Sequence, residues 1–168
     1  DQEGIAGIFS RRERYVNAPE YATMELAALC EHILAEGVEE IVLNTPHIIE
    51  YHKLPKKVRI LHGLPRRDLM TEGMDDTYDA AFIVGQHAMA GGREKGCWRH
   101  TILPHPISRA YSSVEAVWLN DLLVGETGPF AAFAGIHDVP VVLLTGDHWA
   151  CIEAEELLGD VETVAVKK

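Results

Sequence analysis

The amino-acid sequence predicts an α/β fold with a mainly parallel sheet, helices on both faces and a small antiparallel insertion. Strand-like and helix-like segments alternate along most of the chain, which is typical of parallel sheets. The strand-like run at residues 80–84 is apolar throughout, as expected of a strand covered on both faces. Two further short runs are separated only by Asn120-Asp121, which predicts a tight hairpin.

The first half of the chain carries one predicted helix and three predicted strands. Leu26, Leu29 and Ile33 recur at helical spacing, with a proline near the start of the segment and a glycine just past its end. A helix is therefore expected over residues 17–37. Apolar and β-branched runs that stop before proline- or glycine-containing loops then predict strands at residues 38–43, 58–61 and 80–84.

The second half of the chain begins with the hairpin and continues with helices and strands in alternation. An alanine-rich segment after the hairpin predicts a helix, and apolar runs with turn residues around them predict the strands. The expected elements are hairpin strands at 116–119 and 122–124, a helix at 126–136, a strand at 139–144, a helix at 147–158 and a strand at 161–166.

The length of the chain favours a single core. A chain of 168 residues is long enough for one well-packed domain and too short for two generous ones. No internal repeat, low-complexity segment or interdomain linker interrupts it. The strand that should lead into Asp1 is not in the sequence, and the sequence stops directly after a strand. We therefore expect a domain that lacks its first strand and a C-terminal portion.

Composition narrows the range of partners. The formal charge is −11, from 15 basic and 26 acidic residues, and nucleic-acid binding usually needs a clustered basic face, so no nucleic-acid partner is expected. No apolar stretch reaches the roughly 18 residues of a membrane span and no leader is visible, so no membrane association is expected. Three widely spaced cysteines without a C-x-x-C pair favour reduced thiols and a cytoplasmic protein.

Carboxylates and imidazoles gather at the predicted strand ends. Asp1 and Glu3 are one residue apart and precede a glycine, a pattern that suggests the metal-binding edge of a buried strand. His47, His87 and Glu126 each follow a short apolar run, and ligands of open α/β sheets bind outside the carboxyl ends of the strands. These residue types suit zinc or a similar divalent ion, and they suffice for two ions if a carboxylate such as Asp1 bridges them.

Each candidate ligand also has a simpler interpretation. Asp1 and Glu3 could form a solvated, frayed terminus. His47 and His87 could be hydrogen-bonded to loop carbonyl groups, and Glu126 could be a first-turn acidic residue that interacts favourably with a helix dipole. The pattern as a whole favours the metal site, and its chemistry is that of peptide or amide hydrolysis.

His100 differs from the remaining histidines. It lies on the polar, proline-containing stretch at residues 100–113, which could fold back over the crevice at the strand ends. Proton transfer is the role considered for it. The other histidines have no comparable position at a strand end, so surface or loop roles are expected for them.

Several ordered segments resemble the D-aminopeptidase family of zinc peptidases, which includes the dipeptide-transport-associated D-aminopeptidases of bacilli. The similarity covers nearly the whole chain, so residues 1–168 are expected to form a single metallopeptidase-like catalytic domain. The segments that carry it are Asp1-Gln2-Glu3-Gly4-Ile5-Ala6-Gly7, Thr23-Met24-Glu25, residues 40–47 (Glu-Ile-Val-Leu-Asn-Thr-Pro-His), residues 70–80 (Met-Thr-Glu-Gly-Met-Asp-Asp-Thr-Tyr-Asp-Ala), Gly85-Gln86-His87-Ala88, His100-Thr101 and Gly125-Glu126-Thr127-Gly128.

The resemblance implies a site with two zinc ions. Asp1 would bridge the ions, Glu3 and His47 would bind one of them, and His87 and Glu126 would bind the other. His100 would be the catalytic residue, acting in proton transfer or in stabilising the tetrahedral intermediate. The implied activity is release of N-terminal D-amino acids, especially D-alanine, from short peptides by ring-shaped homo-oligomers.

Three positions depart from the family pattern. Thr45 replaces an acidic residue that would orient the ring of the first histidine, Phe130 replaces an asparagine, and Gln86 replaces a common tyrosine. These changes affect substrate identity more than metal binding. Two other functions therefore stay open, namely a dinuclear metal amidohydrolase of other specificity and a non-catalytic metal-binding assembly module.

Overall fold

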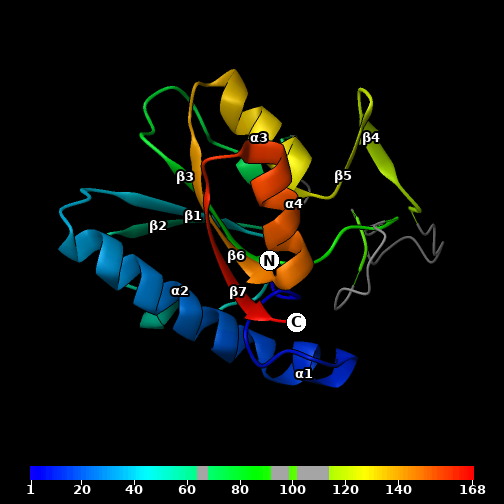
Figure 1. Cartoon of the computed structure of the whole chain (residues 1–168). Coiled ribbons are helices and arrows are strands. Elements are labelled where there is room, and N and C mark those ends of the chain that lie inside the picture. Colours follow the sequence, from blue (N-terminus) through cyan, green and yellow to red (C-terminus); the bar gives the residue numbers. More distant parts are fainter. Residues whose placement is uncertain (64–67, 92–98, 102–113) are drawn as a thin grey trace.

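A computed structural model describes residues 1–63, 68–91, 99–101 and 114–168 of the chain (Figure 1). Of the stretch expected to fold over the crevice, only His100 and Thr101 lie among these residues. No helix among the described ranges is long and apolar enough to cross a membrane.

The strands form two parallel sheets and one antiparallel hairpin. One parallel sheet pairs β1 with β2, and the other has the order β3-β6-β7. Their bounds are Ile41–Thr45 for β1, Val58–His62 for β2, Ala81–Gln86 for β3, Val141–Asp147 for β6 and Glu162–Lys167 for β7. The hairpin joins β4 (Val117–Leu119) to β5 (Leu122–Val124). The predicted fold class is confirmed, including the small antiparallel insertion.

Helices lie on both faces of the three-stranded sheet. Successive side chains of a strand point to opposite faces, and two successive residues of β6 contact different helices. Leu144 of β6 is fully buried in a cluster with residues of α4 (His148–Leu158). The next residue, Thr145, donates a hydrogen bond of 3.0 Å to Glu25 of α2 (Ala18–Ala35) on the other face. A third long helix, α3 (Thr127–Ile136), packs against α4 (Figure 1).

The larger apolar cluster lies between α2 and the β1-β2 sheet. Ala18, Ala22 and Leu26 on one face of α2 are buried against Leu43 of β1 and Ile60 of β2. The helix predicted from the spacing of Leu26, Leu29 and Ile33 is confirmed as α2, and of these three residues Leu26 lies in this cluster. The same cluster takes in Ile5 and Ile8 from the start of the chain, so this segment is packed into the core rather than frayed.

The structure corrects several predictions. Asp1, Glu3 and the residues up to Ile8 form turns and irregular backbone rather than the edge of a strand. A short helix, α1 (Arg11–Val16), was not predicted. Strand β1 begins at Ile41, later than expected, and Phe82 of β3 keeps 41% of its surface exposed, so that strand is not covered on both faces along its length. Two 3₁₀ turns, Tyr51–Lys53 and Leu69–Thr71, were also not predicted.

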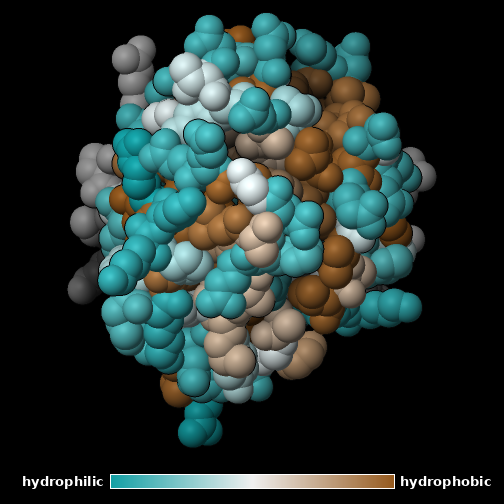
Figure 2. All heavy atoms as spheres, turned by 90° about the vertical axis from the view of Figure 1, so that its left-hand side faces the viewer, coloured by the Kyte–Doolittle hydropathy of each residue, from teal (hydrophilic) through white to brown (hydrophobic). Residues whose placement is uncertain are grey.

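An apolar groove is lined by residues of α2 and of the three-stranded sheet. Its volume is about 670 Å³. Its lining includes Met24 and Leu29 of α2, Val84 of β3, and Val164 and Val166 of β7. Figure 2, which looks onto the left-hand side of Figure 1, shows hydrophobic side chains gathered among hydrophilic ones on this side of the molecule.

Candidate metal centre

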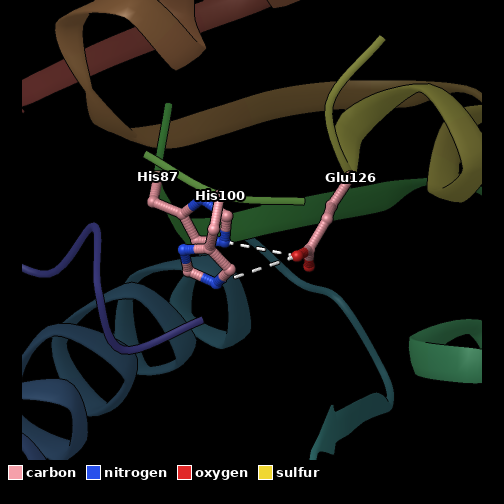
Figure 3. Close-up of side chains that lie close together, drawn as sticks. All are labelled: His87, His100 and Glu126. Atoms are coloured by element: carbon pink, nitrogen blue, oxygen red, sulfur yellow. Dashed lines mark ion pairs between the residues drawn. The ribbon is translucent and has the colours of Figure 1, made fainter. Parts of the chain in front are cut away.

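His87 stands directly after the last residue of β3. Its ring is fully buried, and its Nδ1 lies 3.0 Å from the carbonyl oxygen of Ala88. Because a carbonyl oxygen only accepts, Nδ1 carries the hydrogen and Nε2 presents a lone pair in the neutral ring. That Nε2 lies 3.4 Å from Oε1 of Glu126 and 3.3 Å from Oδ2 of Asp1 (Figure 3 for the Glu126 contact).

Glu126 comes from the opposite side of the site, at the junction between the hairpin and α3. It is the N-cap residue of α3, but its side chain makes no capping hydrogen bond. In Figure 3 the carboxylate instead points toward His87 and His100. Glu126 was also considered as an acidic first-turn residue that interacts with the helix dipole, but it precedes the first turn of α3 as its N-cap residue.

His100 is stacked on His87. The two ring centroids are 3.6 Å apart with an interplanar angle of 17°, and Nε2 of His100 lies 4.0 Å from Oε1 of Glu126. The backbone of this short described segment is fixed by two hydrogen bonds, from the His100 amide to Ala88 and from the Ala90 amide to the Thr101 hydroxyl. His100 is therefore placed at the same strand end as His87.

Asp1 and Glu3 reach the site on a segment without helix or strand. The Asp1 amino group donates to the Val84 carbonyl oxygen, and the Gly4 amide donates to Gly85 at 2.8 Å. This approach requires glycine at position 4, because a Cβ there would lie 2.2 Å from the Gly85 oxygen. The segment is thus held against the carboxyl end of β3.

His47 lies two residues beyond the end of β1. Its Nε2 is 2.8 Å from Oδ1 of Asp1 and 4.0 Å from Oε2 of Glu3. Burial, followed by the nearby terminal ammonium group and Arg14, lowers the pKa of His47 to about 3. The imidazole is therefore neutral near pH 7, which is the form that binds metal ions.

The six predicted residues all converge, in two groups joined by Asp1. We call Asp1, Glu3 and His47 the amino-terminal group, and His87, His100 and Glu126 the strand-end group. In each group the possible ligand atoms lie within 4.8 Å of one another, close enough to hold a metal ion. Asp1 connects the groups, because one of its oxygens faces His47 and the other faces His87.

Each group contains a buried atom that has no hydrogen-bond partner. Nε2 of His87 and Oε2 of Glu3 are buried and make no hydrogen bond. Both atoms are lone-pair donors that face other lone-pair donors, an arrangement that costs free energy unless a cation lies between them. Carboxylate and imidazole are ligand types of zinc, so the residues present fit this ion.

Arg14 of α1 also reaches the amino-terminal group. Its Nη2 lies 2.5 Å from Oε1 of Glu3, whose side chain is only 2% exposed. The guanidinium group thus occupies one carboxylate oxygen and leaves the other directed toward His47. Arg14 was missed because α1 was missed. Ser10 and Glu13 carry a capping-box pattern that predicts a helix start; the Ser10 hydroxyl accepts from the Glu13 amide, and the Glu13 carboxylate accepts from the amide of Phe9, one residue before the N-cap.

Glu153 of α4 lies behind the strand-end group and was also missed. Its Oε1 accepts a hydrogen bond of 2.6 Å from the amide of Gly125, the residue before Glu126. Burial raises the pKa of Glu153 above its ordinary value. No sequence signal singled it out, because the contact joins positions 28 residues apart on different elements.

Comparison with known proteins agrees with this geometry. Residues 1–168 match the model of a protein family described as D-aminopeptidase. The chain belongs to the D-aminopeptidase family. It is 32% identical over 178 aligned residues to the D-aminopeptidase of Bacillus subtilis (strain 168), and the alignment covers 100% of the chain and 61% of that protein.

A solved structure is also similar. It is that of the Zn-dependent D-aminopeptidase DppA from Bacillus subtilis, described as a self-compartmentalizing protease. The TM-score is 0.88 at 30% identity, and the similarity covers 100% of the chain and 62% of DppA. The chain therefore spans about three-fifths of the length of these D-aminopeptidases. The family predicted from the ordered sequence segments is confirmed.

Proposed function

We propose that this member of the D-aminopeptidase family is a zinc-dependent aminopeptidase that releases N-terminal D-amino acids, D-alanine in particular, from short peptides. The observation that carries the proposal is the junction at Asp1. One carboxylate faces imidazoles from two groups at 2.8 Å and 3.3 Å, and each group contains a buried atom that lacks a hydrogen bond. This arrangement supports two metal ions that share a carboxylate.

Each side chain receives a role within this proposal. Asp1 would bridge two zinc ions, Glu3 and His47 would complete one site, and His87 and Glu126 would complete the other. Bound zinc supplies Lewis acidity and lowers the pKa of a bound water to about 7. His100 transfers a proton at Nε2, or stabilises the tetrahedral intermediate there, because that atom lies at the edge of the site, 4.0 Å from Glu126.

The substrate and assembly parts of the proposal come from the relatives. DppA is a self-compartmentalizing protease, and we infer that this chain likewise assembles into a ring-shaped homo-oligomer. Exposed apolar side chains on the hairpin, Trp118 at 63% and Leu122 at 57%, are compatible with contacts between copies. A cytoplasmic location and the assignment of residues 1–168 to one catalytic domain stay predictions.

Two measurements test the proposed function. Metal analysis of the purified protein should find two zinc ions per chain. Hydrolysis should then be compared between D-alanyl dipeptides, the matching L-dipeptides and simple amides, with release of the N-terminal residue followed by chromatography. Equal rates on D- and L-dipeptides would support an amidohydrolase of other specificity. Two bound zinc ions without any hydrolysis would support a metal-binding assembly module.

A further inference from the structure

Lys167, the last residue of β7, is a buried lysine. Only 6% of its surface is exposed, although lysine is among the residue types that are almost never fully buried without a partner. Its Nζ donates hydrogen bonds of 2.5 Å to the carbonyl oxygen of Glu3 and 2.6 Å to that of Ile8. Both acceptors lie at the other end of the chain, more than 150 positions away in sequence.

The segment that receives these bonds needs such a partner. Residues 1–8 contain neither helix nor strand, so their backbone groups cannot be satisfied by a regular ladder. An ammonium group has three donors and no acceptor, and hydrogen bonds from a charged donor are roughly twice as strong as neutral ones. A single Nζ therefore closes the segment between Glu3 and Ile8 and binds it to the sheet.

The position of Lys167 follows from the sheet. In the register of β6 and β7, Lys167 stands opposite Asp147, at the carboxyl end of both strands. His87 follows β3 at the same end of the sheet, on the other side of β6. Its Nζ also lies 5.6 Å from the centre of the Phe9 ring, just past Ile8. Lys168, the next residue, is exposed. Lys167 and Lys168 are thus neighbours of the same residue type, one buried and one exposed, so Lys168 can serve as a control for Lys167.

We propose that Lys167 is a positioning residue of the metal centre, which holds the main chain of Glu3 so that its carboxylate stands opposite His47. The inference rests on the proposed function. Glu3 is then fixed at two points, since Arg14 binds one oxygen of its side chain and Lys167 binds its carbonyl group. Lys167 acts mainly on the amino-terminal group, because the carbonyl groups of Glu3 and Ile8 belong to residues 1–8, and the strand-end group shares only Asp1 with this segment.

Zinc binding to separated sites tests this role. A His87→Ala chain should keep the ion of the amino-terminal group, and a His47→Ala chain should keep the ion of the strand-end group. Adding Lys167→Met should weaken zinc binding by roughly 10- to 100-fold in the first background, as measured by competition with a chromophoric chelator, and much less in the second, where Asp1 is the one ligand that comes from residues 1–8. Lys168→Met, the matched control, should change neither. Unchanged affinity in the first background, or equal loss in both, would overturn the proposal.

A second readout does not involve metal. In zinc-free protein, hydrogen exchange at the amides of Ile5 and Ile8, which close turns in this segment, should become faster in Lys167→Met while α4 keeps its protection. If Lys167→Met does not fold, Lys167→Arg takes its place. It keeps the charge, but its longer side chain holds its N–H donors in a fixed planar fork and places them differently from the single Nζ, so a smaller loss is expected. Unchanged exchange at Ile5 and Ile8 would show that Lys167 does not hold residues 1–8 in place.

The outcomes separate the two proposals. If the unmodified chain binds no zinc, the proposed function fails, and with it the role of Lys167 toward a metal. The exchange experiment still decides whether Lys167 holds residues 1–8. If the chain binds two zinc ions and Lys167→Met changes neither affinity nor exchange, the proposed function stands and the positioning role of Lys167 is wrong.

Discussion

The amino-terminal group and the strand-end group both combine carboxylates with imidazoles but are held in different ways. His87 and Glu126 stand at the end of a strand and the start of a helix, so the backbone ladders of β3 and α3 set their positions. Asp1 and Glu3 lie on irregular backbone and depend on contacts from elements distant in sequence, including Arg14 and Lys167. The hydrogen bonds of a strand and a helix hold the strand-end group in place. The amino-terminal group is held instead by the charged side chains of Arg14 and Lys167.

This difference has a consequence for metal binding. Ligands must be held within a fraction of an ångström for tight and catalytically useful binding. The strand-end group is fixed wherever the sheet is folded, because its ligands extend regular elements. The amino-terminal group can loosen locally without global unfolding, since few regular hydrogen bonds hold it. We therefore expect the amino-terminal group to bind its ion more weakly.

The largest effect should come from His87→Ala. It removes a proposed ligand of the strand-end group. If the proposed function holds, one of the two zinc ions and most peptidase activity are lost, more than the roughly 10- to 100-fold that loss of an outer-shell partner costs. Metal analysis and dipeptide hydrolysis measure both. His148→Ala, at a histidine outside both groups, is the control. Two ions at full occupancy in His87→Ala would refute the assignment.

His100→Ala should have the next largest effect and of a different kind. The histidine lies with His87 and Glu126 in a cluster that could hold a metal, so its geometry alone allows ligation. If His100 transfers a proton, the His100→Ala protein should keep both ions while its kcat falls by about 10²- to 10⁴-fold. Zinc content and rate are measured on the same sample. Loss of an ion would show that His100 is a ligand of the strand-end group.

Sequence reasoning brought together candidate residues that follow regular elements. His47 and His87 were found because the carboxyl ends of parallel strands meet at one edge, and Glu126 because it stands at the start of a helix; in the structure all three lie near Asp1 or near one another, while their role as metal ligands stays a prediction. The backbone around Asp1 and Glu3 was predicted wrongly as a strand edge. Two adjacent carboxylates before a glycine indicate a site, but they do not specify the turn that presents them.

The supporting residues could not be found in the same way. Arg14 lies on a six-residue helix, too short for a clear apolar period, although the capping pattern at Ser10 and Glu13 was readable. Lys167 and Glu153 act through contacts with main-chain groups far away in sequence. Such contacts depend on tertiary packing, which composition and periodicity do not encode.

Arg14→Met tests whether the amino-terminal group depends on charge. It leaves the carboxylate of Glu3, only 2% exposed, without its guanidinium partner. We expect the zinc-free protein to lose about 3 kcal/mol, the lower end for breaking a buried pair, because Arg14 itself keeps 22% exposure. Zinc should restore part of this loss by neutralising Glu3, so the rise in Tm on zinc addition should exceed that of the unmodified chain.

The neighbouring Arg12 gives the matched control for Arg14. It is exposed on the same short helix, and Arg12→Met should leave Tm unchanged with and without zinc. An Arg14→Met protein as stable as the unmodified chain would show that the salt bridge does not hold Glu3. Equal zinc-induced shifts in Arg14→Met and the unmodified chain would show that the ion and Arg14 do not share this carboxylate.

The smallest effect should come from Glu153→Gln, and it concerns pH. Burial raises the pKa of Glu153, so above the ordinary pKa of 4.5 the folded zinc-free chain holds a proton that the unfolded chain has released. The contribution of Glu153 to stability is therefore lost as pH rises through its raised pKa. Glutamine keeps an acceptor for the Gly125 amide and stays neutral, so the variant should be less sensitive to this rise, by no more than about 1 kcal/mol.

The same titration contrasts the two groups. The pKa of His47 is lowered from 6.5 to about 3 in the folded chain, so its contribution to stability is present above pH 6.5 and is lost as the pH falls toward 3. Thermal unfolding of zinc-free protein across this range should show acid loss in both the unmodified chain and Glu153→Gln, and a weaker loss toward neutral pH in Glu153→Gln alone. Glu156→Gln, at an exposed residue of the same helix, should follow the unmodified chain. Identical curves for Glu153→Gln and Glu156→Gln would mean that the burial of Glu153 makes no pH-dependent contribution to the stability of the fold.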